Sequence, residues 1–115
     1  MEKSENPILR LSFEFALKII DFTEELNSKG KFVVSKQLLK SGTSIGANVS
    51  EAQNSESKPD FIHKMKIAAK EAHEAEYWLL LCKYSSHYPT NDILLQDVTS
   101  IIKVLSKIIS TAKKN

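Results

Sequence analysis

The chain has 115 residues, a length typical of one domain, and 42% hydrophobic with 26% charged residues argues against wholesale disorder. Three Gly and three Pro supply too few turns for an all-β fold, and one cysteine, Cys82, excludes an intramolecular disulfide and a multi-cysteine zinc site. The net charge of +2 is too small to indicate a nucleic-acid partner.

The first predicted element is a helix over about residues 7–28, because hydrophobic residues recur there every three or four positions. Asn6 is its expected N-cap, and Pro7 suits the first helical position, where the missing N–H costs nothing. Gly30 is expected to end it.

Two further helices follow with the same spacing. The second is predicted over about residues 35–54, with Ser35 as its N-cap. The third is predicted over about residues 58–86, because Ser57 precedes Asp60 by the three residues of a capping box.

A break at His87–Pro89 precedes a fourth helix, predicted over about residues 91–112. Long helices joined by short loops pack as antiparallel neighbours. The predicted fold is therefore all-α: one antiparallel, up-down four-helix bundle over residues 1–115, with Met1–Glu5 frayed.

No apolar stretch reaches the roughly 18 residues that a membrane span needs. The opening residues carry mixed charge and lack the apolar core of a signal peptide. A cytoplasmic location without membrane contact is the resulting prediction.

One stretch of the second helix, Ser41–Ser50, has no charged residue. A helix without a charged face is usually buried on more than one side, so we expect it to pack against a neighbouring subunit as well as its own bundle. The alternative is a weakly amphipathic helix whose hydroxyl groups face water. The candidate helix-packing and subunit-interface residues are Ser41, Gly42, Ser44, Gly46, Asn48 and Glu51.

The first helix also predicts a homo-oligomer, because its hydrophobic residues spread over more than half of its circumference. The glycine pair in the second helix predicts a close helix crossing, with Gly46 as the position at which a methyl group would destabilise it.

Candidate chemistry is sparse. The polar row that includes Ser41, Ser44 and Asn48 has no nearby His or Lys base, so hydrogen bonding between helices explains it better than catalysis. Glu71 and His73 lie about 200° apart around a helix and cannot share a metal ion. We therefore predict no enzyme activity, no catalytic residue, no metal and no cofactor.

A basic stripe on the third helix is the candidate nucleic-acid-binding feature. Its lysines could follow a phosphate backbone, although a solvated face of mixed charge is the alternative, since Glu71, Glu74 and Glu76 follow closely. The candidate residues are Lys58, Lys64, Lys66 and Lys70.

Three segments carry a family resemblance: QLLKSGTSIGANVSEA (Gln37–Ala52), SKPDF (Ser57–Phe61) and KEAHEAEYWL (Lys70–Leu79). They resemble the bacterial 23S rRNA intervening-sequence proteins, a family related to the accessory proteins of diversity-generating retroelements. The resemblance implies an antiparallel four-helix bundle that assembles into a ring of five subunits. It carries no catalytic residue over to this chain.

Two functional hypotheses remain. The first is a non-enzymatic homo-oligomer, a homopentamer by the resemblance, that associates with RNA or a ribonucleoprotein. The second is a structural or adaptor oligomer that binds a protein partner without direct nucleic-acid contact.

Overall fold

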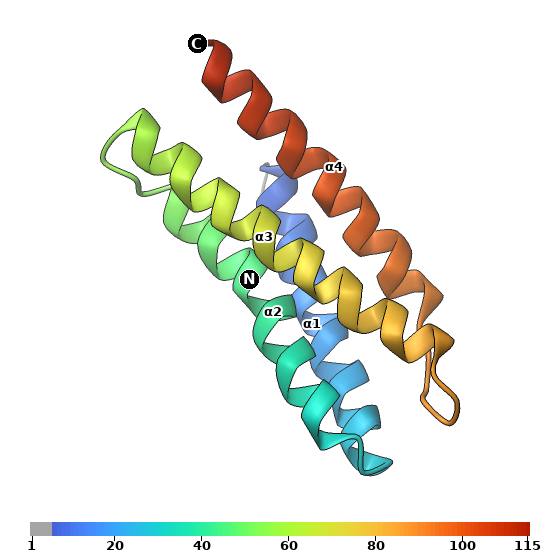
Figure 1. The fold of residues 1–115 in the computed structure, drawn as a ribbon. Coiled ribbons are helices and arrows are strands. Elements are labelled where there is room, and N and C mark those ends of the chain that lie inside the picture. Colours follow the sequence, from blue (N-terminus) through green and yellow to red (C-terminus); the bar gives the residue numbers. More distant parts are fainter. Residues whose placement is uncertain (1–5) are drawn as a thin grey trace.

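The computed structural model describes residues 6–115, so the predicted fraying of Met1–Glu5 lies outside the described part. Four antiparallel helices, with no strand among these residues, form a bundle of 47 × 28 × 20 Å (Figure 1). The helices are α1 (Pro7–Ser28), α2 (Phe32–Ala52), α3 (Lys58–Tyr84) and α4 (Asp92–Lys114). The predicted all-α fold is confirmed.

Each helix packs against its neighbours in the chain, and α4 returns to α1 through the least extensive of the four seams. Helices α1 and α3 make no direct backbone approach, and neither do α2 and α4, so these pairs lie diagonally across the bundle. The α1–α4 seam includes an ion pair between Lys18 Nζ and Asp97 Oδ2 at 2.8 Å.

Three of the four helices begin with side-chain caps, two of which, Asn6 and Ser57, the sequence indicates. Asn6 accepts a hydrogen bond from the Ile8 N–H, and Pro7 occupies the first turn. Ser57 Oγ accepts from the Asp60 N–H at 3.1 Å, and Asn91 accepts from the Leu94 N–H at 3.0 Å. These caps satisfy N–H groups that the helices themselves leave free.

The turn between α1 and α2 depends on Gly30, whose φ of +73° is readily accessible only to glycine. The Gly30 N–H donates to the Asn27 carbonyl and the Lys31 N–H donates to the Leu26 carbonyl. This pair of bonds is a Schellman motif, which ends α1 and reverses the chain within the three residues that separate α1 from α2.

The predicted start of the second helix at Ser35 is wrong. Helix α2 begins at Phe32, and its N-cap, Lys31, makes no side-chain capping bond. Ser35 instead lies buried in the first turns, where its hydroxyl donates to the Thr23 carbonyl of α1 at 3.0 Å. The Gly30 turn places the chain directly into the new helix, so no polar cap residue marks its start.

At the same end of the molecule, α3 stops at Tyr84 and a short loop leads to α4. His87 adopts a positive φ of 66° in this loop. The Lys31 ammonium lies 4.6 Å from the centre of the Tyr88 ring, which connects the start of α2 to the loop.

The core is one cluster that runs the length of the bundle, with contributions from all four helices. The part of the core beside α3 contains small side chains. Three alanines of α3 are fully buried, which allows the neighbouring helices to approach it closely. The largest fully buried side chains of the core are Phe15, Ile19, Leu26, Leu38, Ile45, Met65, Leu79, Leu94, Ile101 and Leu105.

Candidate nucleic-acid and subunit interfaces

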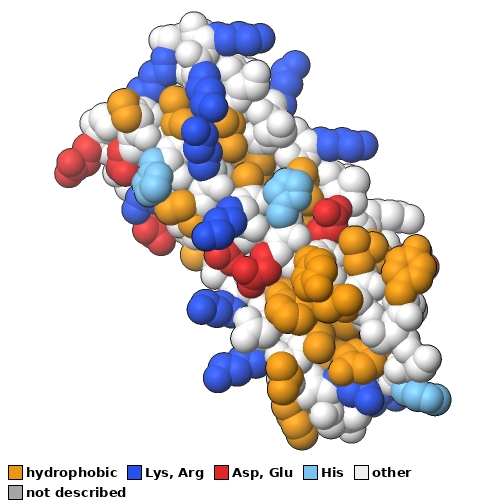
Figure 2. Space-filling model, in the orientation of Figure 1, with side chains coloured by type: hydrophobic (Ala, Val, Ile, Leu, Met, Phe, Trp, Pro, Cys, Tyr) orange, Lys and Arg blue, Asp and Glu red, His pale blue; other side chains and the backbone are white. Residues whose placement is uncertain are grey.

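Lysines gather over one end of the face shown in Figure 2, above the first half of α3 and the second half of α4. Because α3 and α4 are antiparallel, these two halves lie side by side. Half of the sixteen basic residues of the chain belong to these two segments. They are Lys58, Lys64, Lys66, Lys70, Lys103, Lys107, Lys113 and Lys114.

A groove of about 420 Å³ runs between these two helix halves. Lys66 of α3 and Lys113 of α4 line it, and contact with Lys113, together with its charge, lowers the pKa of Lys66. Neither lysine forms an ion pair with a carboxylate among residues 6–115. Two neighbouring ammonium groups without an acidic partner create a site that attracts anions.

The structure separates the four lysines that the sequence groups together. Lys64 turns toward α2, where its Nζ lies 3.2 Å from Glu51 Oε1. Lys66 faces the groove beside α4, whereas Lys58 and Lys70 are exposed on the outer surface of α3. Only Lys66 of the four therefore lines the groove.

The contribution of α4 to this basic surface is missing from the sequence prediction. Residues 98–115 contain Lys103, Lys107, Lys113 and Lys114 and no Asp or Glu. Lysines near the C-terminus of a helix also interact favourably with the helix dipole. The sequence alone therefore allows them to be interpreted as helix-stabilising residues. The acid-free segment was the signal that could have identified them.

The polar stripe of α2 is bonded mainly to its own helix, so the predicted hydrogen bonding between helices is wrong for its hydroxyl and amide groups. Ser41 Oγ donates to the Gln37 carbonyl and Ser44 Oγ to the Lys40 carbonyl. Asn48 Nδ2 donates to the Ser44 carbonyl at 2.8 Å. These side chains reach the carbonyl one turn back, as short polar groups in a helix can. In this stripe, Glu51 reaches another helix through its ion pair with α3.

A methyl group would fit worse at Gly42 than at Gly46, the position that the sequence singled out. A Cβ at Gly42 would lie 2.8 Å from Cγ1 and 2.9 Å from Cγ2 of Ile19. A Cβ at Gly46 would lie 3.4 Å from the Ser12 carbonyl oxygen, an ordinary contact distance. The close crossing that the glycine pair predicts is therefore inside the protomer, where Gly46 faces the Ser12 backbone of α1 and Gly42 faces the Ile19 side chain.

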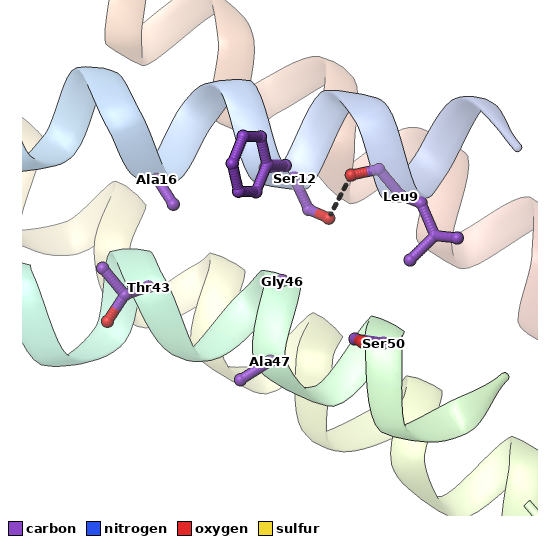
Figure 3. A pocket seen from close by; sticks show the side chains of 8 residues that line it. Leu9, Ser12, Ala16, Thr43, Gly46, Ala47 and Ser50 are labelled. Carbon is purple, nitrogen blue, oxygen red and sulfur yellow. Dashed lines mark hydrogen bonds between the residues drawn. The ribbon is translucent and has the colours of Figure 1, made fainter. Parts of the chain in front are cut away.

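A groove of about 340 Å³ opens on the outer side of the same seam. Figure 3 shows Leu9, Ser12 and Ala16 of α1 pointing toward α2, where Gly46 faces them. None of its lining residues carries a charge, which agrees with the uncharged stretch of the sequence. They are Leu9, Ser12, Phe13, Ala16, Thr43, Gly46, Ala47 and Ser50.

Helix α1 continues this apolar surface with exposed side chains one turn apart. Phe13, Leu17 and Ile20 are 41%, 50% and 40% exposed. Because α1 contacts α2 and α4 but not α3, this surface points away from the bundle axis. We call Phe13, Leu17 and Ile20, together with the groove beside α2, the α1–α2 surface.

A second apolar surface covers the second half of α3. Tyr77, Leu80, Leu81 and Tyr84 repeat at helical spacing and are all exposed, Tyr84 to 79%. Figure 2 shows hydrophobic side chains gathered over this half of the helix, at the opposite end from the lysines. We call these four residues the α3 apolar surface.

Groups that could support catalysis or metal binding are few in the described chain. No cluster of three or more His, Cys, Asp or Glu side chains could hold a metal ion among residues 6–115. Cys82 is buried in the core, as predicted, and burial raises the pKa of its thiol. A raised pKa keeps a thiol protonated and poorly nucleophilic.

The comparisons with known proteins identify the family. The model of the 23S rRNA-intervening sequence proteins matches residues 4–110. The chain belongs to this family. A crystal structure from Bacteroides thetaiotaomicron, of a protein with unknown function from the S23 ribosomal protein family, is 46% identical and superposes with a TM-score of 0.82. The match covers 89% of this chain and 97% of that one.

No curated protein is similar enough to this family member to count as a match. In the part of the chain that the structure describes, no helix has both the length and the apolar character that crossing a membrane requires.

Proposed function

We propose that this member of the 23S rRNA-intervening sequence family is a non-enzymatic, cytoplasmic homo-oligomer that associates with RNA. The observation that carries the RNA part is the gathering of lysines over α3 and α4, where Lys66 and Lys113 line one groove and pair with no carboxylate of the described residues. Binding to such a surface is electrostatic, so it is tolerant of sequence and weakens steeply with salt.

The homo-oligomer part rests on two apolar surfaces that lie on diagonal helices. The α1–α2 surface and the α3 apolar surface point away from each other, since α1 and α3 occupy opposite corners of the bundle. A two-fold dimer pairs one surface with its own copy, whereas two different surfaces favour head-to-tail association, which forms a ring when the rotation between successive subunits closes. The occupant of each surface is thus a second copy of this chain, and five subunits is the number that we propose.

Light scattering and fluorescence anisotropy test the two parts separately. The oligomer predicts a molar mass that is a multiple of 13.0 kDa, and a mass of 13.0 kDa at micromolar concentration would contradict it. The RNA association predicts that a fluorescein-labelled oligouridylate binds at low salt and is released as potassium chloride is raised. Absence of binding at low salt would contradict it.

The substitution Leu81→Lys places a charge in the α3 apolar surface and is expected to dissociate the oligomer, because the ammonium would lose water in the contact. Ile93→Lys is the matched control, since Ile93 is 62% exposed and lies outside both surfaces. A protein-binding adaptor is the second candidate function. An oligomer that survives Leu81→Lys would favour it, since the α3 apolar surface would then be free for a different protein.

A further inference from the structure

The groove between α3 and α4 combines positive charge with neutral hydrogen-bond donors. Lys66 and Lys113 supply ammonium groups, and Ser106 and Ser110, one turn apart on α4, supply hydroxyls. Ala69 and Ile109 are the half-buried apolar residues of its lining, and the exposed His73 completes it. Ammonium and hydroxyl groups are the donors that proteins most often direct at phosphate oxygens.

The pairing of the two lysines is unfavourable in the protein alone. Their mutual repulsion lowers the pKa of Lys66, and no carboxylate of the described chain forms an ion pair with either of them. Lys64 shows the contrast, because only two residues away its charge is neutralised by Glu51. An anion between Lys66 and Lys113 would relieve the repulsion that the fold leaves in place.

We propose that this groove is a phosphate subsite for the RNA backbone, in which Lys66 and Lys113 hold one phosphodiester group and Ser106 and Ser110 donate hydrogen bonds to it. The subsite rests on the proposed RNA association and locates it at particular residues. Lys70 and Lys107 add positive charge within the same helix turns as the groove, and Lys103 lies about one turn before Ser106 on α4.

The lining of the groove also specifies what is read. His73 is the one ring in its lining, and no Phe, Tyr, Trp, Arg, Asn or Gln lines it, so it offers little stacking surface and few of the paired donors that discriminate bases. The subsite therefore recognises the sugar-phosphate chain and not the base. A strand without bases should bind to it as well as oligouridylate does.

The first experiment compares two double variants of equal net charge by anisotropy over a range of potassium chloride concentrations. The double variant Lys66→Gln with Lys113→Gln removes the subsite. The control, Lys29→Gln with Lys36→Gln, removes two exposed lysines, one in the turn between α1 and α2 and one in α2. Each lost phosphate contact reduces the salt slope by about 0.7 for single strands. Because the two lysines hold one phosphate group, the first variant should lose about 0.7 and the control almost nothing. Light scattering on both variants verifies unchanged assembly.

A neutral variant separates hydrogen bonding from charge. Ser106→Ala with Ser110→Ala should weaken binding roughly threefold while the salt slope stays unchanged, because hydroxyl groups release no counterions. An abasic oligonucleotide of the same length should bind to the unmodified protein as tightly as oligouridylate.

Three results would overturn the subsite. Equal losses in the two double variants would mean that net charge alone drives binding, and intact binding in the first variant would place the RNA elsewhere while leaving the proposed function standing. Displacement of the probe by inorganic phosphate at constant ionic strength, to the same extent as by unlabelled oligouridylate, would reassign the groove to a small anion. Absence of binding by the unmodified protein would remove the proposed function and the subsite together.

Discussion

The α1–α2 seam and the α3–α4 seam are both contacts between antiparallel helices, yet uncharged residues line the groove of the first and lysines line that of the second. The first is closed on the inner side of the bundle, with Gly42 against Ile19 and the Ser35 hydroxyl bonded to the Thr23 carbonyl, and its outer groove has no charged lining residue. The second opens toward solvent in a groove where Lys66 and Lys113 meet. The closed seam maximises packing, whereas the open seam keeps unneutralised charge available to a ligand.

The contrast teaches that the two helix pairs of a small bundle can divide structural and binding roles. Atoms on the inner side of the closed seam have their partners within the protomer, so substitutions there should change stability. The open seam contains a repulsive pair that contributes nothing favourable to folding, so substitutions there should change binding more than stability. Four predictions follow this division, from the largest effect to the smallest.

Gly42→Ala should cost about 1–3 kcal/mol of unfolding free energy, because the new methyl group overlaps the branched Cγ atoms of Ile19. Gly46→Ala should be neutral or stabilising by up to about 1 kcal/mol, since its methyl group meets Ser12 at contact distance and alanine favours the helix. Urea denaturation of the two variants measures both effects. A larger loss of unfolding free energy for Gly46→Ala than for Gly42→Ala would contradict this prediction.

Ser35→Ala should cost about 1 kcal/mol, because the buried hydroxyl loses its bond to the Thr23 carbonyl across the α1–α2 seam. Ser44→Ala is the control, since the Ser44 hydroxyl bonds only to its own helix and alanine has the higher helix propensity. Thermal melting should show a lowered melting temperature for Ser35→Ala alone. Equal melting of both variants would mean that the bond between helices adds no stability.

Lys113→Gln should raise the pKa of Lys66 toward its ordinary value, because the contact and charge that lower it are removed. The same variant should have a slightly higher melting temperature than the unmodified protein at low salt. Added salt should remove this difference, since it screens exposed charges. NMR titration of the lysine side chains measures the pKa change directly. An unchanged Lys66 titration would show that the two ammonium groups are not neighbours in solution.

Glu71→Gln should stabilise the protein slightly at neutral pH. Burial raises the pKa of the Glu71 carboxyl above 4.5, and the charge of Glu74 raises it further against the opposing effects of Lys70 and Lys40. A raised native pKa means that the native state binds more protons than the unfolded state, so stability falls as pH rises from 4.5 through the native value. The advantage of the variant should vanish below pH 4.5. A variant that is no more stable than the unmodified protein at neutral pH, or whose advantage persists below pH 4.5, would contradict this assignment.

Most of the fold follows from local signals in the sequence. Asn6, Ser57 and Asn91 cap helices where the hydrophobic spacing begins, and the positive φ of Gly30 ends α1. The start of α2 could not be predicted this way, because tertiary packing and not a polar cap fixes it.

The candidate site is only partly readable from the sequence. Spacing along α3 groups Lys64 with Lys66, but the two side chains point toward different neighbouring helices. Lys113 lies 47 positions after Lys66, and only the antiparallel packing of α3 and α4 brings it to the same groove. The glycine pair predicts a close crossing, but the identity of the facing side chain decides which glycine is required.

The central claim is that RNA binds to the α3–α4 seam, and lysine footprinting tests it most directly. The protein is acetylated with and without excess oligouridylate, and mass spectrometry measures the loss of reactivity at each lysine. The account predicts protection of Lys66 and Lys113, with Lys29 and Lys36 equally reactive in both samples. Protection centred on Lys29 and Lys36, or spread evenly over all lysines, would contradict it.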